Sequence, residues 1–274
     1  NPGGESCGDG LVDPGETCDS GNLDNKTCVD FGFQVGSLRC GNDCRFDLSE
    51  CRKKACSELN WNVDVLFVVD SSGSMANEQA KLASAMTDFV SALHQSDQGL
   101  PNLHIGFITP DLGSAPYNLP GCETPGGDGG VYLKGSGNSC INPVNQKYVV
   151  DIEPRGCTIV KNVLVGEVTT CPTHDCSQDH CDPAAFSNLD GVPTEPSGLQ
   201  LALDSNGCPR CRNYTDQILA DVLECMTAIG TTGCGFEQPL EAMYQALNSN
   251  HEDNELFLRN DAVLTVFFVT DEDD

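Results

Sequence analysis

Two stretches of the chain alternate between apolar strands and amphipathic helices. Residues 63–70 are almost entirely apolar and rich in β-branched side chains, which predicts a buried strand. A stripe of apolar residues then recurs at helical spacing and predicts a helix over roughly residues 76–95. The stripe consists of Leu82, Met86, Phe89 and Leu93. A second apolar strand follows at residues 103–109, and this strand–helix–strand order predicts an α/β domain with a parallel sheet.

The same alternation returns near the end of the chain. Apolar stripes predict helices within residues 218–229 and 240–247, with a glycine-rich loop at residues 230–235 between them. The run at residues 262–269 is strongly apolar and predicts a last strand. These elements would continue the α/β domain that the earlier stretch begins.

Residues 110–211 interrupt this rhythm. They hold 11 of the 15 prolines and 8 of the 17 cysteines, and only residues 147–152 and 159–168 resemble strands. A structureless loop of this length would be unusual in a compact domain. We therefore interpret the segment as a long insertion that owes its order to disulfides.

The first 60 residues have a different composition. They are small, polar and rich in Gly and Asp, so disulfides must supply most of their stability. The cysteines lie at positions 7, 18, 28, 40, 44 and 51. Six cysteines allow fifteen pairings, and the sequence does not choose between them. We expect a cysteine-rich domain at residues 1–58, followed by the α/β domain with its insertion at residues 59–274.

Composition narrows the classes of partner and compartment. The chain carries 14 Lys and Arg against 41 Asp and Glu, and this net charge of −27 argues against nucleic acid and anionic membranes as partners. Its 17 cysteines favour an oxidising compartment, and no apolar run has the length of a membrane span. Because the chain opens on Asn1-Pro2, we expect a mature extracellular or cell-surface protein without its signal peptide. A lipid anchor cannot be read from the sequence.

The sharpest chemical signal follows the first strand. Asp70, Ser72 and Ser74 place a carboxylate and two hydroxyls on a turn after a strand, where open α/β sheets build binding sites. Hard oxygen ligands with little charge suit Mg²⁺, which keeps waters and an open coordination position. The alternative is a serine-rich loop in which Ser74 caps the next helix. These residues alone do not decide between the two.

Two later segments supply groups that complete such a site. Thr231 and Thr232 lie in the glycine-rich loop, and Asp271 follows the last apolar strand. All three would meet Asp70 at one edge of the sheet, because parallel strands end together.

With these residues in place, the chain resembles a von Willebrand factor type A domain. The family's metal-ion-dependent adhesion site motif, Asp-x-Ser-x-Ser, matches residues 70–74, and the resemblance covers about residues 60–109 and 212–274. A bacterial secreted subgroup common in myxobacteria is similar at further segments. These are Cys208–Tyr214, Gly230–Ala242, Phe257–Arg259 and Phe268–Asp274. The N-terminal Cys-Gly-Asp-Gly … Gly-Glu-Thr-Cys-Asp pattern is similar to myxobacterial cysteine-rich repeats.

The resemblance implies a Rossmann-like fold with a metal site. The family's ligand positions correspond to Asp70, Ser72, Ser74, Thr231, with Thr232 a weaker match, and Asp271, which acts partly through water. Mg²⁺ is the expected ion, and Mn²⁺ or Ca²⁺ would fit the same ligands. A carboxylate from a protein or peptide partner would take the ion's free position, since few negative ligands leave the ion electrophilic. The net charge of −27 does not prevent this, because salt screens charges beyond about 8 Å.

The chain departs from the family in two ways. Its insertion at residues 110–211 is unusually long and rich in cysteine, and the chain ends at Asp274, where a complete domain would continue. The strand at residues 262–269 would then be an open apolar edge, which is an aggregation hazard. We expect either another chain or a further C-terminal segment to cover it. An odd cysteine count, with Cys56 left over, suggests that this segment brings a cysteine.

Two cysteine motifs have structural explanations that we favour. The segment from Cys171 to Cys181, with His174 and His180, has a zinc-like composition, but disulfides explain it better in an oxidised protein. Cys208-Pro-Arg-Cys211 has the spacing of redox proteins without a thioredoxin-like context.

Acidic turns in the cysteine-rich domain form another candidate cation site, for Ca²⁺. The residues are Asp9, Asp13, Glu16, Asp19 and Asp24. Their spacing does not match an EF-hand loop, so solvated surface carboxylates remain the simpler interpretation.

These observations favour an extracellular adhesion or protein-binding module that uses a metal-ion-dependent adhesion site. The alternative is a structural subunit of an extracellular filament or matrix, which would self-associate by strand addition at the open edge. An enzyme is not expected, because no histidine lies in a recognisable catalytic motif and Ser72 lacks the Gly-x-Ser-x-Gly turn.

Overall fold

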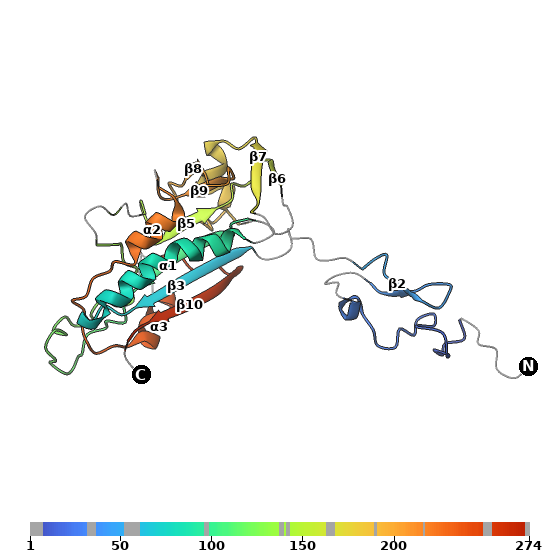
Figure 1. Cartoon of the computed structure of the whole chain (residues 1–274), viewed down its shortest axis with the longest axis horizontal. Coiled ribbons are helices and arrows are strands. Elements are labelled where there is room, and N and C mark those ends of the chain that lie inside the picture. Colours follow the sequence, from blue (N-terminus) through green and yellow to red (C-terminus); the bar gives the residue numbers. More distant parts are fainter. Residues whose placement is uncertain are drawn as a thin grey trace, which may run out of the picture. The chain divides into compact units, whose positions relative to one another are not determined.

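The computed structural model describes most of the chain, which separates into two compact units at residues 1–60 and 61–274. The described residues are 8–31, 37–51, 61–95, 99–136, 140, 143–162, 168–188, 191–215, 217–248 and 254–271. Cys56, the expected odd cysteine, lies outside them. The larger unit has a mixed α/β fold (Figure 1). Disulfides within the smaller unit hold that unit together.

A six-stranded mixed sheet forms the centre of the larger unit, in the order β10–β3–β4–β5–β9–β8 (Figure 1). The strands are β3 (Asn62–Val69), β4 (Asn102–Ile108), β5 (Val149–Ile152), β8 (Gln200–Leu203), β9 (Pro209–Arg212) and β10 (Ala262–Val269). β10, β3 and β4 run parallel, as the three apolar runs predict. The pairings of β5 with β4, β5 with β9, and β8 with β9 are antiparallel.

The segment at residues 110–211, which we interpret as a disulfide-rich insertion, contributes strands to the sheet, and its predicted strand at residues 147–152 is confirmed as β5. It supplies β5, β8 and nearly all of β9, so the sheet is mixed and not parallel throughout. These strands have four residues each, and charged side chains interrupt the apolar pattern of β5 and β9. The described residues of the run at 159–168 contribute β6 (Ile159–Asn162), which pairs with β7 (Thr170–His174) in a separate two-stranded sheet. Residues 163–167 lie outside the described part.

Helices cover both faces of the sheet. α1 (Ala76–His94) and α2 (Leu219–Met226) pack on one face, and α3 (Pro239–Asn248) packs on the other (Figure 1). Alternation along β3 explains the two layers, because Val65, Phe67 and Val69 face α1. Leu66 and Val68 face the α3 side. Short 3-10 turns lie at Cys28–Phe31, Gly73–Met75, Gln178–Cys181 and Pro183–Phe186.

A tight contact explains the glycine in the middle of β4. A Cβ at Gly106 would overlap the ring of Tyr132 and lie 3.1 Å from that of Phe257. Both rings are fully buried on the α3 side of the sheet. The glycine therefore allows two loop aromatics to pack directly on the strand.

A buried charge cluster joins β5 to β9. Arg210 Nε donates to Asp151 Oδ1 at 2.5 Å, and Arg212 Nε donates to Asp151 Oδ2 at 2.9 Å. The hydroxyl of Tyr214 donates to Asp151 Oδ2 at 2.5 Å. Burial raises the pKa of Asp151, but the two guanidinium groups outweigh it, so the pKa lies below its usual 3.8.

A second buried charge cluster joins β3 and β4 to the loops that cover them. Arg259 donates from its backbone N–H and from Nε to Asp64 at 2.8 and 2.9 Å. A hydrogen bond of 2.6 Å joins His104 Nε2 to Glu195 Oε2, and Arg259 Nη1 lies 3.5 Å from Glu195 Oε1. Burial raises the pKa of Asp64 above 3.8, although Arg259 opposes this.

Five disulfides tie the larger unit together. They are Cys122–Cys234, Cys140–Cys225, Cys157–Cys176, Cys171–Cys208 and Cys181–Cys211. The disulfide interpretation of the zinc-like segment is therefore confirmed. Cys208 and Cys211 pair with Cys171 and Cys181 and not with each other, so this Cys-x-x-Cys motif is structural.

The smaller unit has little regular structure. A short hairpin, β1 (Arg39–Cys40) and β2 (Phe46–Asp47), stands beside the disulfides Cys18–Cys40 and Cys28–Cys51. Its buried apolar cluster is small and includes two of these cysteines, Cys28 and Cys51. Disulfides thus take the place of a core, as composition predicts. Among the described residues of both units, no helix has the length and apolar character needed to cross a membrane.

Candidate metal-binding site at the carboxyl edge of the sheet

The parallel pairing of β3 with β10 brings the predicted site residues together. Val69 lies opposite Val269, so the turns after the two strands begin at the same level. The backbone N–H of Asp70 donates to Val269 O at 2.9 Å and extends this pairing by one bond. Asp70 and Asp271 therefore meet at one edge of the sheet although 200 residues separate the strands.

Hydrogen bonds join four of the five predicted residues in a chain. The backbone N–H of Ser72 donates to Asp70 Oδ1 at 2.6 Å. The hydroxyls of Ser72 and Ser74 share a hydrogen bond of 3.1 Å, and Ser74 Oγ donates to Asp271 Oδ1 at 3.2 Å. Carboxylate and hydroxyl oxygens from both strand ends thus converge on one turn.

The serines of this turn do not cap the helix that follows. α1 begins at Ala76 after the 3-10 turn, and neither Ser72 nor Met75 at the two cap positions makes a side-chain capping bond. The hydroxyl of Ser74 bonds instead to Ser72 and Asp271. The capping alternative for Ser74 is therefore wrong.

The glycine-rich loop with Thr231 and Thr232 lies against the Asp70 turn through its backbone. Gly233 N–H donates to Ser71 O at 2.8 Å, and a Cβ at Gly233 would overlap the hydroxyl of Ser71. The carbonyl of Thr231 lies 4.0 Å from the position of a Cβ on Gly73. Within the described residues no hydrogen bond links the Thr231 hydroxyl to the other predicted ligands. The structure thus brings the threonine loop to the site while its hydroxyl stays outside the chain of bonds.

Two residues that sequence reasoning missed support the same edge. Gln79 on α1 is buried, and its Nε2 donates to Asp70 O at 2.9 Å and to Gly230 O at 2.8 Å, so it ties the two loops together. Thr270 Oγ1 donates to Asp70 Oδ2 at 3.1 Å. Thr270 directly precedes Asp271 and could have been suspected, but nothing in the sequence marks Gln79.

Among the described residues, no cationic side chain balances the charge of Asp70. Its side chain is completely buried, like those of Asp64 and Asp151, which pair with arginines. In the described part of the chain, no Lys, Arg or His forms an ion pair with Asp70 or Asp271. Buried charges in proteins are normally paired or coordinate a metal. The oxygen-only donor set at this edge fits a hard divalent cation.

Two pockets flank the Asp70 turn. The first, which we call the aromatic pocket, has a volume of about 310 Å³. It is lined by Val68, Asp70, Pro110, Gly235, Phe236, Glu237, Pro239, Phe268, Val269 and Thr270. The second, the acidic pocket, has a volume of about 340 Å³, and Ser71, Thr109, Asp111, Asp128, Gly230 and Thr232 are among its lining residues. The disulfide Cys122–Cys234 joins two loops that line or adjoin the acidic pocket.

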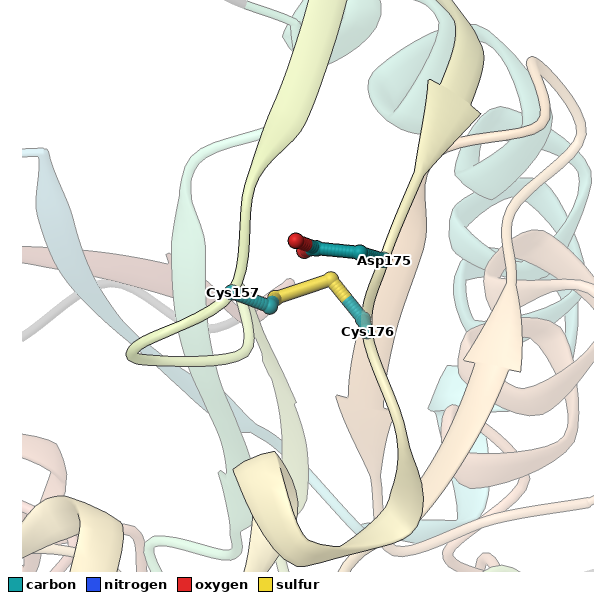
Figure 2. Close-up of side chains that lie close together, drawn as sticks. All are labelled: Cys157, Asp175 and Cys176. Carbon is teal, nitrogen blue, oxygen red and sulfur yellow. A yellow bond between two sulfur atoms is a disulfide. The ribbon is translucent and has the colours of Figure 1, made fainter.

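Two other groupings of acidic residues and cysteine are structural. Figure 2 shows Asp175 beside the Cys157–Cys176 disulfide, and its Oδ1 accepts a hydrogen bond from Thr158 N–H. Glu16 and Asp19 lie beside Cys44, which is also disulfide-bonded. Disulfide sulfurs are not thiolates, so neither grouping offers a sulfur ligand for a metal.

The acidic turns of the smaller unit use their carboxylates to hold the backbone. Asp19 accepts hydrogen bonds from the N–H groups of Gly8 and Gly10, which lower the pKa of its carboxyl despite burial. Similar turn bonds run from Leu11 N–H to Asp9 and from Asp13 N–H to Glu16. Calcium binding by these carboxylates stays a prediction.

The predicted site residues of the larger unit thus lie at one edge, with four of them in hydrogen-bonded contact and the threonine loop beside them. Comparison of the chain with protein-family models, with curated proteins and with solved structures gave no match.

Proposed function

We propose that the larger unit is a von Willebrand factor type A domain that binds a partner's carboxylate through a divalent cation. The observation that carries this proposal is the unbalanced charge of Asp70. A buried carboxylate without a cationic partner is unfavourable unless a proton or a metal ion neutralises it. Hydroxyls at Ser72 and Ser74 and a second carboxylate at Asp271 surround it with hard oxygens.

Each residue then has a role in the binding step. Ser72 and Ser74 would hold the ion directly, while Asp70 and Asp271 would supply negative charge, and Thr231 would complete the set from the adjoining loop. When bound, Mg²⁺ would offer an electrophilic position to an outside carboxylate. Gln79 keeps the two loops in place through its bonds to Asp70 and Gly230. The seven disulfide pairs of the described residues fit an oxidising, extracellular setting.

The direct test is metal binding by the full chain. Titration calorimetry with MgCl₂ and MnCl₂ should show one saturable site of the wild type that Asp70→Asn removes. Asn keeps the size of the side chain and an acceptor oxygen, so the variant should fold normally by circular dichroism. The matched control is Asp88→Asn on the exposed face of α1, which removes the same charge and should bind metal as the wild type does. Equal metal binding by Asp70→Asn and wild type would contradict the proposal.

A second function, a subunit of an extracellular filament or matrix, is favoured by β10. This strand is at the edge of the sheet, and Val263, Leu264 and Phe267 on it are exposed. Such an edge can accept a strand from another chain. Sedimentation velocity of the purified full chain should then show concentration-dependent assembly, which Leu264→Lys weakens. A monomer at every concentration would count against this function without touching the metal site.

A further inference from the structure

The aromatic pocket opens directly beside the proposed metal site. Asp70 and Thr270 line this pocket, and they are also joined by the hydrogen bond from Thr270 Oγ1 to Asp70 Oδ2. The side chains of Phe236 and Phe268 form part of its wall, and they are 48% and 43% exposed. Two half-exposed aromatic rings next to a buried carboxylate make an unusual surface for a chain of net charge −27.

We propose that the aromatic pocket receives an apolar side chain that is next to the metal-binding carboxylate in the partner's sequence. The proposal rests on the function proposed above and adds a recognition rule to it. The partner's motif is an Asp or Glu followed or preceded by a large apolar residue, aromatic or branched aliphatic. Consecutive Cα atoms lie 3.8 Å apart, so a neighbouring side chain reaches a pocket that shares Asp70 with the ion's ligands.

The contrast with the acidic pocket decides on which side the apolar group lies. Asp111 and Asp128 line that pocket, and within the described residues neither forms an ion pair. The hydroxyl of Ser71 is buried there without a hydrogen-bond partner. An apolar side chain would strip water from these groups, which is unfavourable. In the aromatic pocket, which Asp70 and Glu237 also line, the same side chain would cover Phe236 and Phe268.

The apolar surface continues from the pocket along α3. Leu240 and Tyr244 lie four residues apart on α3 and are exposed, and Phe236, which is also exposed, lies three residues before the helix begins. Residues four apart on a helix share one face. A partner anchored at the ion thus finds further exposed apolar side chains on the α3 side, beyond the aromatic pocket.

The test is a selection of random heptapeptides displayed on phage, using the full chain loaded with Mg²⁺ and eluting with EDTA. The selected peptides should share an acidic residue with Phe, Tyr, Trp, Leu or Ile next to it. For the most enriched peptide, replacing that apolar neighbour with Gly should weaken binding about tenfold in calorimetry.

Pocket variants complete the test. The double variant Phe236→Ser, Phe268→Ser should bind the enriched peptide about tenfold more weakly and the Gly analogue with unchanged affinity. Val160→Ser on β6 is the control, since it removes an equally exposed apolar side chain elsewhere. Circular dichroism should show that both variants keep the fold, and Mg²⁺ titration should show that both still bind the metal.

The outcomes separate the two proposals. Acidic peptides without an apolar neighbour, or a double variant that binds like the wild type, would overturn the pocket and leave the metal-dependent function standing. Apolar peptides that ignore EDTA would overturn the link between pocket and ion. A selection without any EDTA-sensitive peptides would overturn the function and the pocket with it.

Discussion

Two acidic centres lie at opposite ends of the parallel strands, and the protein treats their charges differently. Near the amino ends, Asp151 is completely buried and accepts hydrogen bonds from Arg210, Arg212 and Tyr214. At the carboxyl ends, Asp70 is equally buried, and within the described part of the chain its carboxylate accepts hydrogen bonds from the Ser72 amide and the Thr270 hydroxyl. No cationic side chain of the described residues pairs with it.

This difference distinguishes a carboxylate that stabilises the fold from one that is a candidate for ligand binding. The charge of Asp151 is balanced within the fold, so its cluster holds β5 to β9 and leaves nothing for a ligand. Among the described residues no side chain balances the charge of Asp70, and the surrounding oxygens are of the kind that suits a divalent cation. Buried ionisable groups therefore indicate a binding site here only when the protein does not provide the counter-charge.

The largest effect is expected from breaking the balanced centre. Arg210→Met leaves Asp151 short of one guanidinium and removes the bonds of Arg210 to Leu100 O and Pro101 O. Breaking a buried pair in this way typically costs about 3–5 kcal/mol of unfolding free energy. Guanidinium chloride unfolding with intact disulfides measures it, with the exposed Lys81→Met as control. A loss no larger than that of the control would show that the cluster does not stabilise the fold.

A smaller effect, dependent on metal, is expected at the unbalanced centre. In EDTA, Asp70→Asn should be at least as stable as the wild type, because it removes an unpaired buried charge. At a Mg²⁺ concentration of 100 times the dissociation constant, the wild type should gain about 2.7 kcal/mol and the variant nothing. Thermal unfolding of the wild type and the variant in the two buffers shows whether their order of stability reverses. The same loss of stability for Asp70→Asn in both buffers would remove the distinction between the two centres.

The smallest effect is a difference in the pH dependence of stability between Asp151 and Asp64, two buried carboxylates that pair with arginines. The pKa of Asp151 lies below 3.8, so its contribution to stability is present above that pH and is lost as the pH falls through the lower, folded-state pKa. The pKa of Asp64 lies above 3.8, so its contribution is lost as the pH rises through its folded-state pKa. The stability gap between the wild type and Asp151→Asn should therefore narrow in acid, and the gap to Asp64→Asn should narrow toward neutral pH. Melting temperatures of the wild type and both variants from pH 2 to 7 show how each stability gap changes with pH. If both gaps narrowed in the same direction of pH, the opposite pKa shifts of Asp151 and Asp64 would be contradicted.

The parts of the fold that the sequence predicts are those with long apolar patterns. β3, β4, β10 and α1 fall within one or two residues of their expected bounds, because each strand is a run of seven or eight mainly apolar residues and the helix carries a repeated apolar stripe. β8 and β9 escaped prediction. β9 reads Pro-Arg-Cys-Arg, and its arginines are buried only because Asp151 on β5 lies beside them.

The residues of the candidate site also differ in whether the sequence alone predicts them. Asp70, Ser72 and Ser74 form a local motif, so their convergence needs only a turn after a strand. Asp271 follows from the parallel order of the strands, which apolar runs already suggest. Gln79 carries no local signal, because its value depends on a carbonyl of Gly230 that is 151 residues away.

The sequence by itself determined where the long apolar strands and the amphipathic helices lie, where the hydroxyl and carboxylate motif is, and that the cysteines would be oxidised. These properties depend on neighbours along the chain and on composition. Only the tertiary structure decided which cysteines pair, that the segment at residues 110–211 supplies strands of the sheet, and that Asp70 is buried with no counter-charge among the described residues. Each of these depends on contacts between distant segments, as in the disulfide that joins Cys122 to Cys234 across 112 residues. Local patterns cannot specify such contacts, because many pairings satisfy the same pattern and only packing in three dimensions selects one.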